Sequence, residues 1–317
     1  MSFKKEPQKF NAKINELTIG TPGNEIVLGG ENVLPFYTFD APIEHRPKIG
    51  VVIYDSGYCK GIPGCDVFYN GASTAQEAAK KAAAMPGADF LVICLRGAHP
   101  DKGDKSPEEC ASLVKEIADV VDIPIAVIGC DNIEKDARLF EKVSEAVHGK
   151  NILILSAREE NYKTIAAAAG LAYSQKVGAE SAVDINLAKQ LNVLITQMGI
   201  KPENMAMNLG SAAAGYGFEY VISTMERVKL AALAQDDAML QMPIITPVFA
   251  DAWSVKESTA SEEDYPDWGP VEKRGINMEV ATAAACLAAG SNAVILMHPD
   301  SVATISSLVG ALVGGEA

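Results

Sequence analysis

Positive charge is scarce in this 317-residue sequence, which has 27 Lys and Arg residues against 41 Asp and Glu residues and a formal net charge of −14. A surface this acidic repels a phosphate backbone, so we expect no nucleic-acid partner. Aromatic residues make up only 6% of the chain. They leave few rings on which single-stranded bases could stack.

Long apolar runs are also missing. The most apolar stretch, 281–297, is interrupted by Thr, Gly, Ser and Asn residues, so it is too short and too broken to cross a bilayer. The first residues, 1–7, carry charge but lack the apolar segment of a signal peptide. We therefore expect a cytoplasmic protein with no membrane partner.

Cysteine is infrequent and irregularly spaced, with six residues at positions 59, 65, 94, 110, 130 and 286. Four thiolates from Cys59, Cys65, Cys94 and Cys130 could in principle hold an iron–sulfur cluster. No C-x₂-C element is present, however, and Cys94 falls inside an expected strand. We therefore expect no cluster on this chain. Cysteines in or beside apolar runs usually behave as small hydrophobic side chains.

Self-sufficient catalytic motifs are absent as well. The sequence has no P-loop, no G-x-S-x-G element and no pair of histidines at metal-ligand spacing. His99 and His298 stand in loops beside Pro and Asp residues, where a structural role is more common than a catalytic one. We predict no catalytic residue and no metal ligand in this chain.

What the sequence does have is a succession of short apolar runs. These runs are nearly continuous rather than alternating, which is typical of strands buried on both faces. They cover residues 49–54, 90–95, 125–129, 152–155, 182–185, 205–208, 243–248 and 293–297.

Helical patterns with start signals separate these runs. Residues 73–76 and 106–109 resemble capping boxes, and Pro107 occupies the first helical position of the second. At 131–134, Asp131 is the expected cap of a further helix. Eight strands that alternate with helices imply parallel pairing through right-handed crossovers.

The fold predicted from this alternation is an α/β protein, a (β/α)₈ TIM barrel over residues 49–317. A doubly wound open sheet is the alternative, but no G-x-G-x-x-G spacing follows the first run. Residues 1–48 differ in character. There the segments 13–18 and 25–28, joined through a Thr-Pro-Gly-Asn turn, predict a β-hairpin extension that precedes the barrel.

In such a barrel, ligands bind at the carboxyl ends of the strands. Asp131, Asn186 and Ser156 follow strands and could simply cap the next helix. Capping explains Asp184 less well, because a carboxylate inside an apolar strand needs a partner. The residues that we predict to lie at a binding site share a position on strand-end loops: Asp131, Asn132, Asp184, Asn208, Gly210 and Trp253.

Several longer strings point to a known family. The chain resembles the small (delta) subunit of the corrinoid/iron–sulfur protein of the CO dehydrogenase/acetyl-CoA synthase system. The resemblance covers nearly the whole chain and rests on residues 29–31, 34–36, 131–136, 161–163, the Ala-rich 165–172, 184–192, 215–220 and 225–233.

This resemblance implies a function in which the barrel is one half of a heterodimeric methyl carrier. In the family a larger subunit carries a [4Fe–4S] cluster and a corrinoid domain, and the small subunit's barrel mouth closes over the cobalamin. The pair takes a methyl group from methyl-tetrahydrofolate or another methyl-tetrahydropterin and passes it to acetyl-CoA synthase in the Wood–Ljungdahl pathway. The implied partners are the large subunit, the methyltransferase, the synthase/CO dehydrogenase and a reductive activator.

Two other interpretations fit the same barrel. One is a pterin-dependent methyltransferase that binds methyl-tetrahydrofolate itself, with Asp131, Asn132, Asp184 and Asn208 as residues of the right type to hold the pterin ring. The other is a purely structural subunit whose mouth docks a partner domain without touching the cofactor. The strings above favour the carrier subunit, in which the cofactor performs the chemistry and the protein supplies shape and orientation.

Overall fold

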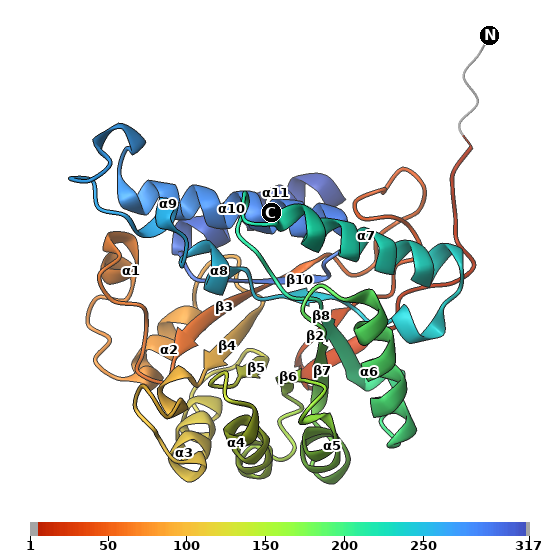
Figure 1. Cartoon of the computed structure of the whole chain (residues 1–317), viewed down its shortest axis with the longest axis horizontal. Coiled ribbons are helices and arrows are strands. Elements are labelled where there is room, and N and C mark those ends of the chain that lie inside the picture. Colours follow the sequence, from red (N-terminus) through yellow and green to blue (C-terminus); the bar gives the residue numbers. More distant parts are fainter. Residues whose placement is uncertain (1–5, 315–317) are drawn as a thin grey trace.

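Eight parallel strands form the wall of a nearly closed barrel in the computed structural model, which describes residues 6–314 (Figure 1). The neighbours run in the order β8-β7-β6-β5-β4-β3-β10-β9. Met207 of β8 also bridges to Ile244, just before β9, and its N–H donates to the carbonyl of Pro243 at 2.8 Å. The TIM barrel is therefore confirmed. Its strands are β3 (Lys48–Tyr54), β4 (Phe90–Cys94), β5 (Ile125–Ile128), β6 (Leu153–Ala157), β7 (Lys176–Glu180), β8 (Met205–Asn208), β9 (Ile245–Thr246) and β10 (Ala293–Leu296).

Helices follow the strands and surround the barrel. They are α2 (Ala75–Ala83), α3 (Pro107–Ala118), α4 (Ile133–Ala146), α5 (Tyr162–Ile165) with a π-helical continuation at Ala166–Ala172, α6 (Ile185–Gln197), α7 (Phe218–Ala234), α10 (Val271–Ala289) and α11 (Pro299–Val313). Shorter helices lie in the loops after β3 and β9: α1 (Pro63–Phe68), α8 (Val248–Ala252) and α9 (Lys256–Thr259). None of the helices described between residues 6 and 314 is both long and apolar enough to cross a membrane.

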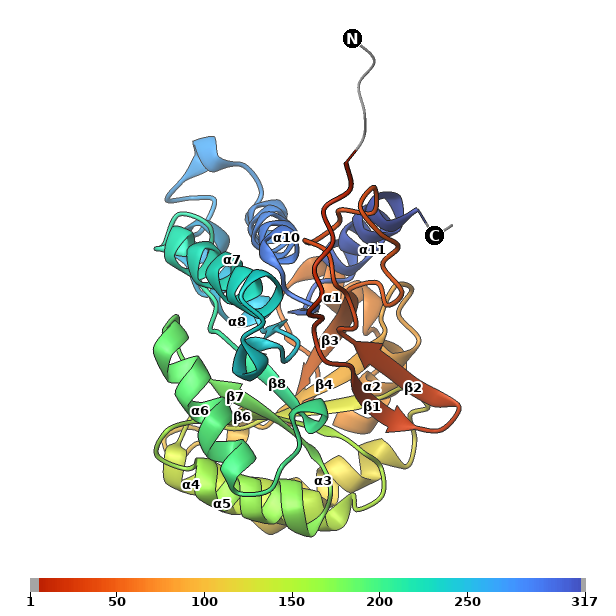
Figure 2. The same ribbon diagram turned by 90° about the vertical axis from the view of Figure 1, so that its right-hand side faces the viewer.

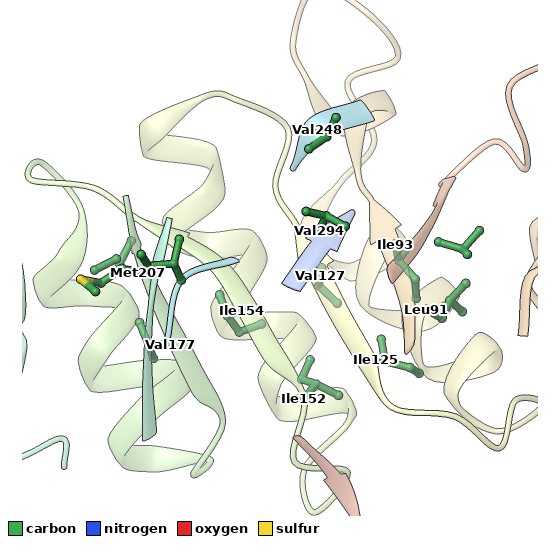
Figure 3. Packing of buried hydrophobic residues seen from close by; sticks show 14 of the residues in the cluster. Leu91, Ile93, Ile125, Val127, Ile152, Ile154, Val177, Met207, Val248 and Val294 are labelled. Atoms are coloured by element: carbon green, nitrogen blue, oxygen red, sulfur yellow. The ribbon is translucent and has the colours of Figure 1, made fainter. Parts of the chain in front are cut away.

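The two faces of each apolar strand are buried in different layers. One face packs against the surrounding helices, and the other lies in the barrel interior. Leu91 and Ile93 of β4 pack with the helices in the outer core, which Figure 3 shows together with Val127, Ile154 and other residues of that layer. The alternate residues of the same strand, such as Val92, point into the barrel interior. Because successive side chains of a strand point to opposite faces, a continuous apolar run satisfies both layers at once.

The predicted hairpin is present and closes one end of the barrel. It consists of β1 (Leu17–Thr21) and β2 (Asn24–Leu28), which pair antiparallel (Figure 2). Leu17 and Leu28 share the interior core with Phe90, the first residue of β4. The hairpin therefore covers the amino ends of the strands. Its first strand begins later than the expected 13–18. The domain boundary between 1–48 and 49–317 stays a prediction, because the hairpin and the barrel share this core.

Asn151 fastens the hairpin to the barrel. Its side-chain amide donates to the carbonyls of Thr18 and Gly20, at 3.1 and 2.8 Å. Replacing Asn151 with Ala removes both bonds and places Ala at a left-handed φ of 50°, which Asn tolerates better. We therefore expect a lower urea midpoint and a loss of unfolding free energy of about 1–3 kcal/mol. The exposed Asn186 on α6 is the matched control, and Asn186→Ala should leave the midpoint unchanged. Equal midpoints for the two variants would contradict this role.

Two expected strands are shifted. The fifth strand is Lys176–Glu180, not 182–185, because Ala182 and Val183 adopt left-handed φ values of 44° and 67° and form a turn. Asp184 is therefore not inside a strand. It caps α6, and its carboxylate accepts the N–H groups of Asn186 and Leu187. In the seventh run, 243–248, only Ile245–Thr246 is a strand, and α8 begins at Val248.

The predicted helix starts are close to those observed. The capping box of Ser106 and Glu109 is confirmed, with Pro107 at the first helical position. The box of α2 is shifted by one residue, because Thr74 and Glu77 form it. Asn132, not Asp131, caps α4, since its side chain accepts the N–H of Lys135.

Candidate functional site

A wide cavity of about 970 Å³ opens at the carboxyl ends of the strands. This is the end opposite the hairpin, and in Figure 1 the loop helices α1, α8 and α9 lie on that side. Apolar side chains such as Ile62, Phe249 and Met297 form part of the wall. The charged residues that line it comprise five carboxylates and three cations: Asp131, Asp136, Glu180, Asp251 and Glu272, with Arg96, Lys102 and Arg158.

Four of the six predicted site residues line this cavity, namely Asp131, Asn208, Gly210 and Trp253. The other two are helix caps outside it: Asn132 caps α4 and Asp184 caps α6. Asp184 is exposed, and its carboxylate is occupied by backbone N–H groups of its own helix.

Arg158 connects the carboxyl ends of three neighbouring strands on one side of the cavity. Its guanidinium lies 2.8 Å from the carboxylate of Asp131, which follows β5, and 2.8 Å from that of Glu180 at the end of β7. A second nitrogen, Nε, also donates to Glu180 at 2.9 Å. The planar guanidinium can hold two carboxylates in fixed directions, which a point charge cannot do. Arg158 therefore sets the geometry of this side of the mouth.

Asn208 extends the same network at the end of β8. Its amide nitrogen donates to Ser156 Oγ at 3.0 Å and to Glu180 at 3.3 Å, while its oxygen accepts the N–H of Gly210 at 3.0 Å. Asn208 is only 5% exposed, so these bonds fix its orientation. Gly210 has a φ of +84°, a left-handed conformation that favours glycine.

Two other carboxyl groups lie on the cavity wall in poorly solvated positions. Burial raises the pKa of Asp136, although the N–H of Cys130, 2.7 Å away, opposes the shift. A Cβ at Gly129 would lie 2.3 Å from this carboxylate, so glycine is needed there. Burial also raises the pKa of Asp251. Buried acids with raised pKa values in a cleft are frequent in binding sites.

The thiols that line the cavity are protonated at neutral pH. Burial raises the pKa of Cys94 and of Cys130 to about 12 and also raises that of Cys59. All six cysteines are free. Among residues 6–314 no group of three or more His, Cys, Asp or Glu side chains is arranged to hold a metal ion.

Sequence reasoning missed two residues at the centre of this network. Glu180 is the last residue of the observed fifth strand of the barrel. It was missed because the prediction placed that strand at 182–185. Arg158 follows β6 directly, and its place at a strand end was the available signal. Its partner Glu180 lies 22 residues away in the sequence, so the pairing itself left no local pattern.

Solved structures with the same architecture are dihydropteroate synthases. The Xanthomonas albilineans enzyme with 4-aminobenzoic acid aligns with a TM-score of 0.56 and 12% identity, over 93% of this chain and 98% of that chain. A Yersinia pestis enzyme in a sulfonamide drug complex gives a TM-score of 0.54 and 15% identity, over 84% of this chain and 93% of that chain. At these identities the likeness supports the barrel fold alone.

Sequence comparisons are more specific. The family model described as CO dehydrogenase/acetyl-CoA synthase delta subunit matches residues 16–301. The acetyl-CoA decarbonylase/synthase complex subunit delta 2 of Methanosarcina acetivorans is 34% identical over 302 residues, 93% of this chain and 68% of the relative. The delta subunit of Archaeoglobus fulgidus is 32% identical over 329 residues, 98% of this chain and 71% of the relative. The chain therefore belongs to the CO dehydrogenase/acetyl-CoA synthase delta subunit family.

Proposed function

We propose that this delta subunit pairs with a larger corrinoid/iron–sulfur subunit in the cytoplasm and that its barrel mouth helps to enclose the cobalamin of that pair. The match to the delta-subunit family over residues 16–301 carries the proposal. The [4Fe–4S] cluster belongs to the larger subunit. The further partners are a methyl-tetrahydrofolate methyltransferase, acetyl-CoA synthase/CO dehydrogenase and a reductive activator.

The chemistry of the cavity suits a corrinoid. A corrin has broad apolar faces and a rim of amide side chains, and a suitable site combines apolar walls with a few fixed polar groups. Here Phe249, Trp253 and Met297 offer apolar surface. Asn208 and the Arg158 network offer hydrogen-bonding groups whose directions are already fixed. The residues present therefore fit the cofactor.

In this proposal the cofactor and the residues of this chain have different roles. The corrinoid, when bound, supplies the methyl-transfer chemistry, taking the group from a methyl-tetrahydropterin for delivery to acetyl-CoA synthase. The residues of this chain bind and orient the cofactor and exclude water from one side of it. We assign contact with the cofactor to Asp131, Asn208, Gly210 and Trp253. We assign Asn132 and Asp184 to capping.

Replacing Asn208 with Leu tests this assignment. The change keeps the branched shape of the side chain but removes its hydrogen bonds to Ser156, Glu180 and Gly210 and leaves the carboxylate of Glu180 less well satisfied. In the pair formed with the larger subunit, we expect corrinoid retention through gel filtration to fall about tenfold. Retention is measured from the visible absorption of the corrinoid per mole of heterodimer.

Asp184→Asn is the matched control, since Asn still caps a helix well and the position lies outside the cavity. It should retain as much corrinoid as the parent. Equal retention by the Asn208 variant, with an unchanged melting temperature, would refute the assignment of Asn208. Demethylation of methyl-tetrahydrofolate by this chain alone with free cobalamin would instead favour the pterin-dependent methyltransferase.

A further inference from the structure

Trp253 is part of the cavity wall, and several neighbouring residues restrict the position of its side chain. It follows the last residue of α8, and its backbone N–H donates to the carbonyl of Phe249. Its indole lines the cavity beside Glu272 and Met297 and is half-buried. One part of this large aromatic side chain therefore faces the space that a ligand would occupy.

The backbone of helix α10 lies directly against the indole ring. A Cβ at Gly275 of α10 would lie 2.2 Å from Cζ3 of Trp253, which is too close for two carbon atoms that are not bonded to each other. Only glycine at this position lets the ring lie against the helix backbone. The backbone of α10 therefore limits the positions that the indole can adopt on this side.

The ring of His298 supports the indole. The two rings are nearly parallel, with centroids 5.8 Å apart and an interplanar angle of 17°. His298 is only 1% exposed and caps α11, where its Nδ1 accepts the N–H of Asp300 at 3.1 Å. Because Nδ1 is an acceptor, Nε2 carries the proton and donates to Glu272 at 3.1 Å. Both ring nitrogens are thereby fixed.

Two glutamates of α10 complete the support. Glu272 also accepts the N–H of Gly64 in α1, where a Cβ would lie 2.6 Å from Nε2 of His298. Glu279 is fully buried and accepts the N–H groups of Met297 and His298, at 2.7 and 3.2 Å. Burying a carboxylate is costly unless it is well bonded. Support of this kind, with each side chain held by packing and by surrounding hydrogen bonds, is typical of a preorganised binding surface.

We propose that the indole of Trp253 is a contact surface for the bound corrinoid and that His298 is the positioning residue that holds it there. This inference rests on the proposed function. The observation that carries it is that Gly275 of α10 and the ring of His298 both lie against one indole that lines the cavity, while Glu272 and Gly64 hold His298 in turn.

Fluorescence of the chain without cofactor tests the positioning role. The sequence has two tryptophans, so Trp268→Phe leaves Trp253 as the sole indole. In this background His298→Asn keeps a good helix cap but removes the ring and the bond to Glu272. We expect the acrylamide quenching constant of Trp253 to rise about twofold or more, because the indole gains freedom and exposure. An unchanged quenching constant would overturn the role of His298.

Corrinoid retention tests the contact itself, in pairs of the larger subunit with the Trp268→Phe chain. Trp253→Leu should lower retention about tenfold, and Trp253→Phe, which keeps an aromatic face, should restore most of it. Melting temperatures identify folded variants, and Trp253→Phe keeps the test valid if Leu is not tolerated. Retention by the Leu variant equal to that of a loaded parent would overturn this inference and the contact assigned to Trp253, but would leave the shared enclosure of the corrinoid standing. A parent pair that takes up no corrinoid would overturn the proposed function and this inference with it.

Discussion

Replacing Lys229 with Met is expected to lower the free energy of unfolding by about 3–5 kcal/mol, because it leaves a buried carboxylate without its counter-charge. Lys229 Nζ lies 2.6 Å from Glu31 and donates to Asn292 Oδ1 at 2.9 Å, and the two charged side chains are only 3% and 12% exposed. Asn292 also donates to Glu31 at 2.8 Å. This triad ties the segment after the hairpin to α7 and to the start of β10.

The loss should depend on pH. Although burial acts in the opposite direction, Lys229 and the hydrogen bonds around Glu31 lower its pKa below the ordinary value of 4.5. An acid with a lowered pKa in the folded state stabilises the fold above its ordinary pKa, and this contribution is lost as the pH falls through the lowered value. The difference between the parent and Lys229→Met should therefore be large at pH 7 and shrink below about pH 4.5.

Two controls separate the ion pair from a general effect of losing a lysine. Lys142 forms an exposed pair with Glu145 on α4, and Lys142→Met should leave the unfolding midpoint nearly unchanged. Adding Glu31→Leu to Lys229→Met should recover a large part of the lost stability, since no buried charge remains. Urea unfolding monitored by circular dichroism measures all four proteins. A loss for Lys229→Met no greater than that for Lys142→Met would contradict the account.

Arg158→Met is expected to have the largest effect at the cavity, with corrinoid retention by the proposed heterodimer falling about tenfold or more. Without the guanidinium, the carboxylates of Asp131 and Glu180 repel each other on one side of the mouth, and Asn208 loses the fixed position of one acceptor. Because the guanidinium is partly solvated, we expect a smaller change in the free energy of unfolding, about 1–2 kcal/mol.

Lys at position 158 distinguishes charge from geometry. Arg158→Lys keeps the charge but cannot bond both carboxylates in the same directions, so its retention should fall between that of the parent and that of the Met variant. Arg138→Met, at an exposed position on α4, is the matched control and should retain corrinoid like the parent. Unchanged retention by Arg158→Met would show that the network is not part of the binding surface.

The fold was largely predictable, since strands buried on two sides leave continuous apolar runs that need no long-range information. The fifth strand failed for a physical reason. Gly178 stands in the middle of it because a Cβ there would lie 2.4 Å from a methyl group of Leu155 in the next strand. With Lys176 and Glu180 at its ends, this strand has too little apolar bulk to be recognised. The adjacent run 182–185 has the apolar pattern of a buried strand and was predicted as the strand instead. In the structure, however, Val183 adopts a left-handed conformation that β-branched residues rarely take.

The candidate site was predictable only in part. The rule that ligands bind at strand ends found Asp131, Asn208, Gly210 and Trp253, because each ends a strand or lies in the segment that follows one. It could not find the arrangement behind Trp253, which depends on Gly275 and His298 from distant parts of the chain. Close approaches of this kind depend on tertiary packing, and the glycines that allow them look like any others in the sequence.

The central claim is that this chain and its larger subunit enclose a corrinoid together. The most direct measurement is the visible absorption spectrum of the chain purified alone, and of the co-purified pair, after addition of cobalamin and gel filtration. The account predicts a colourless chain alone and corrinoid bands that stay with the pair. A colourless pair, with a chain that by itself demethylates methyl-tetrahydrofolate in the presence of free cobalamin, would contradict it.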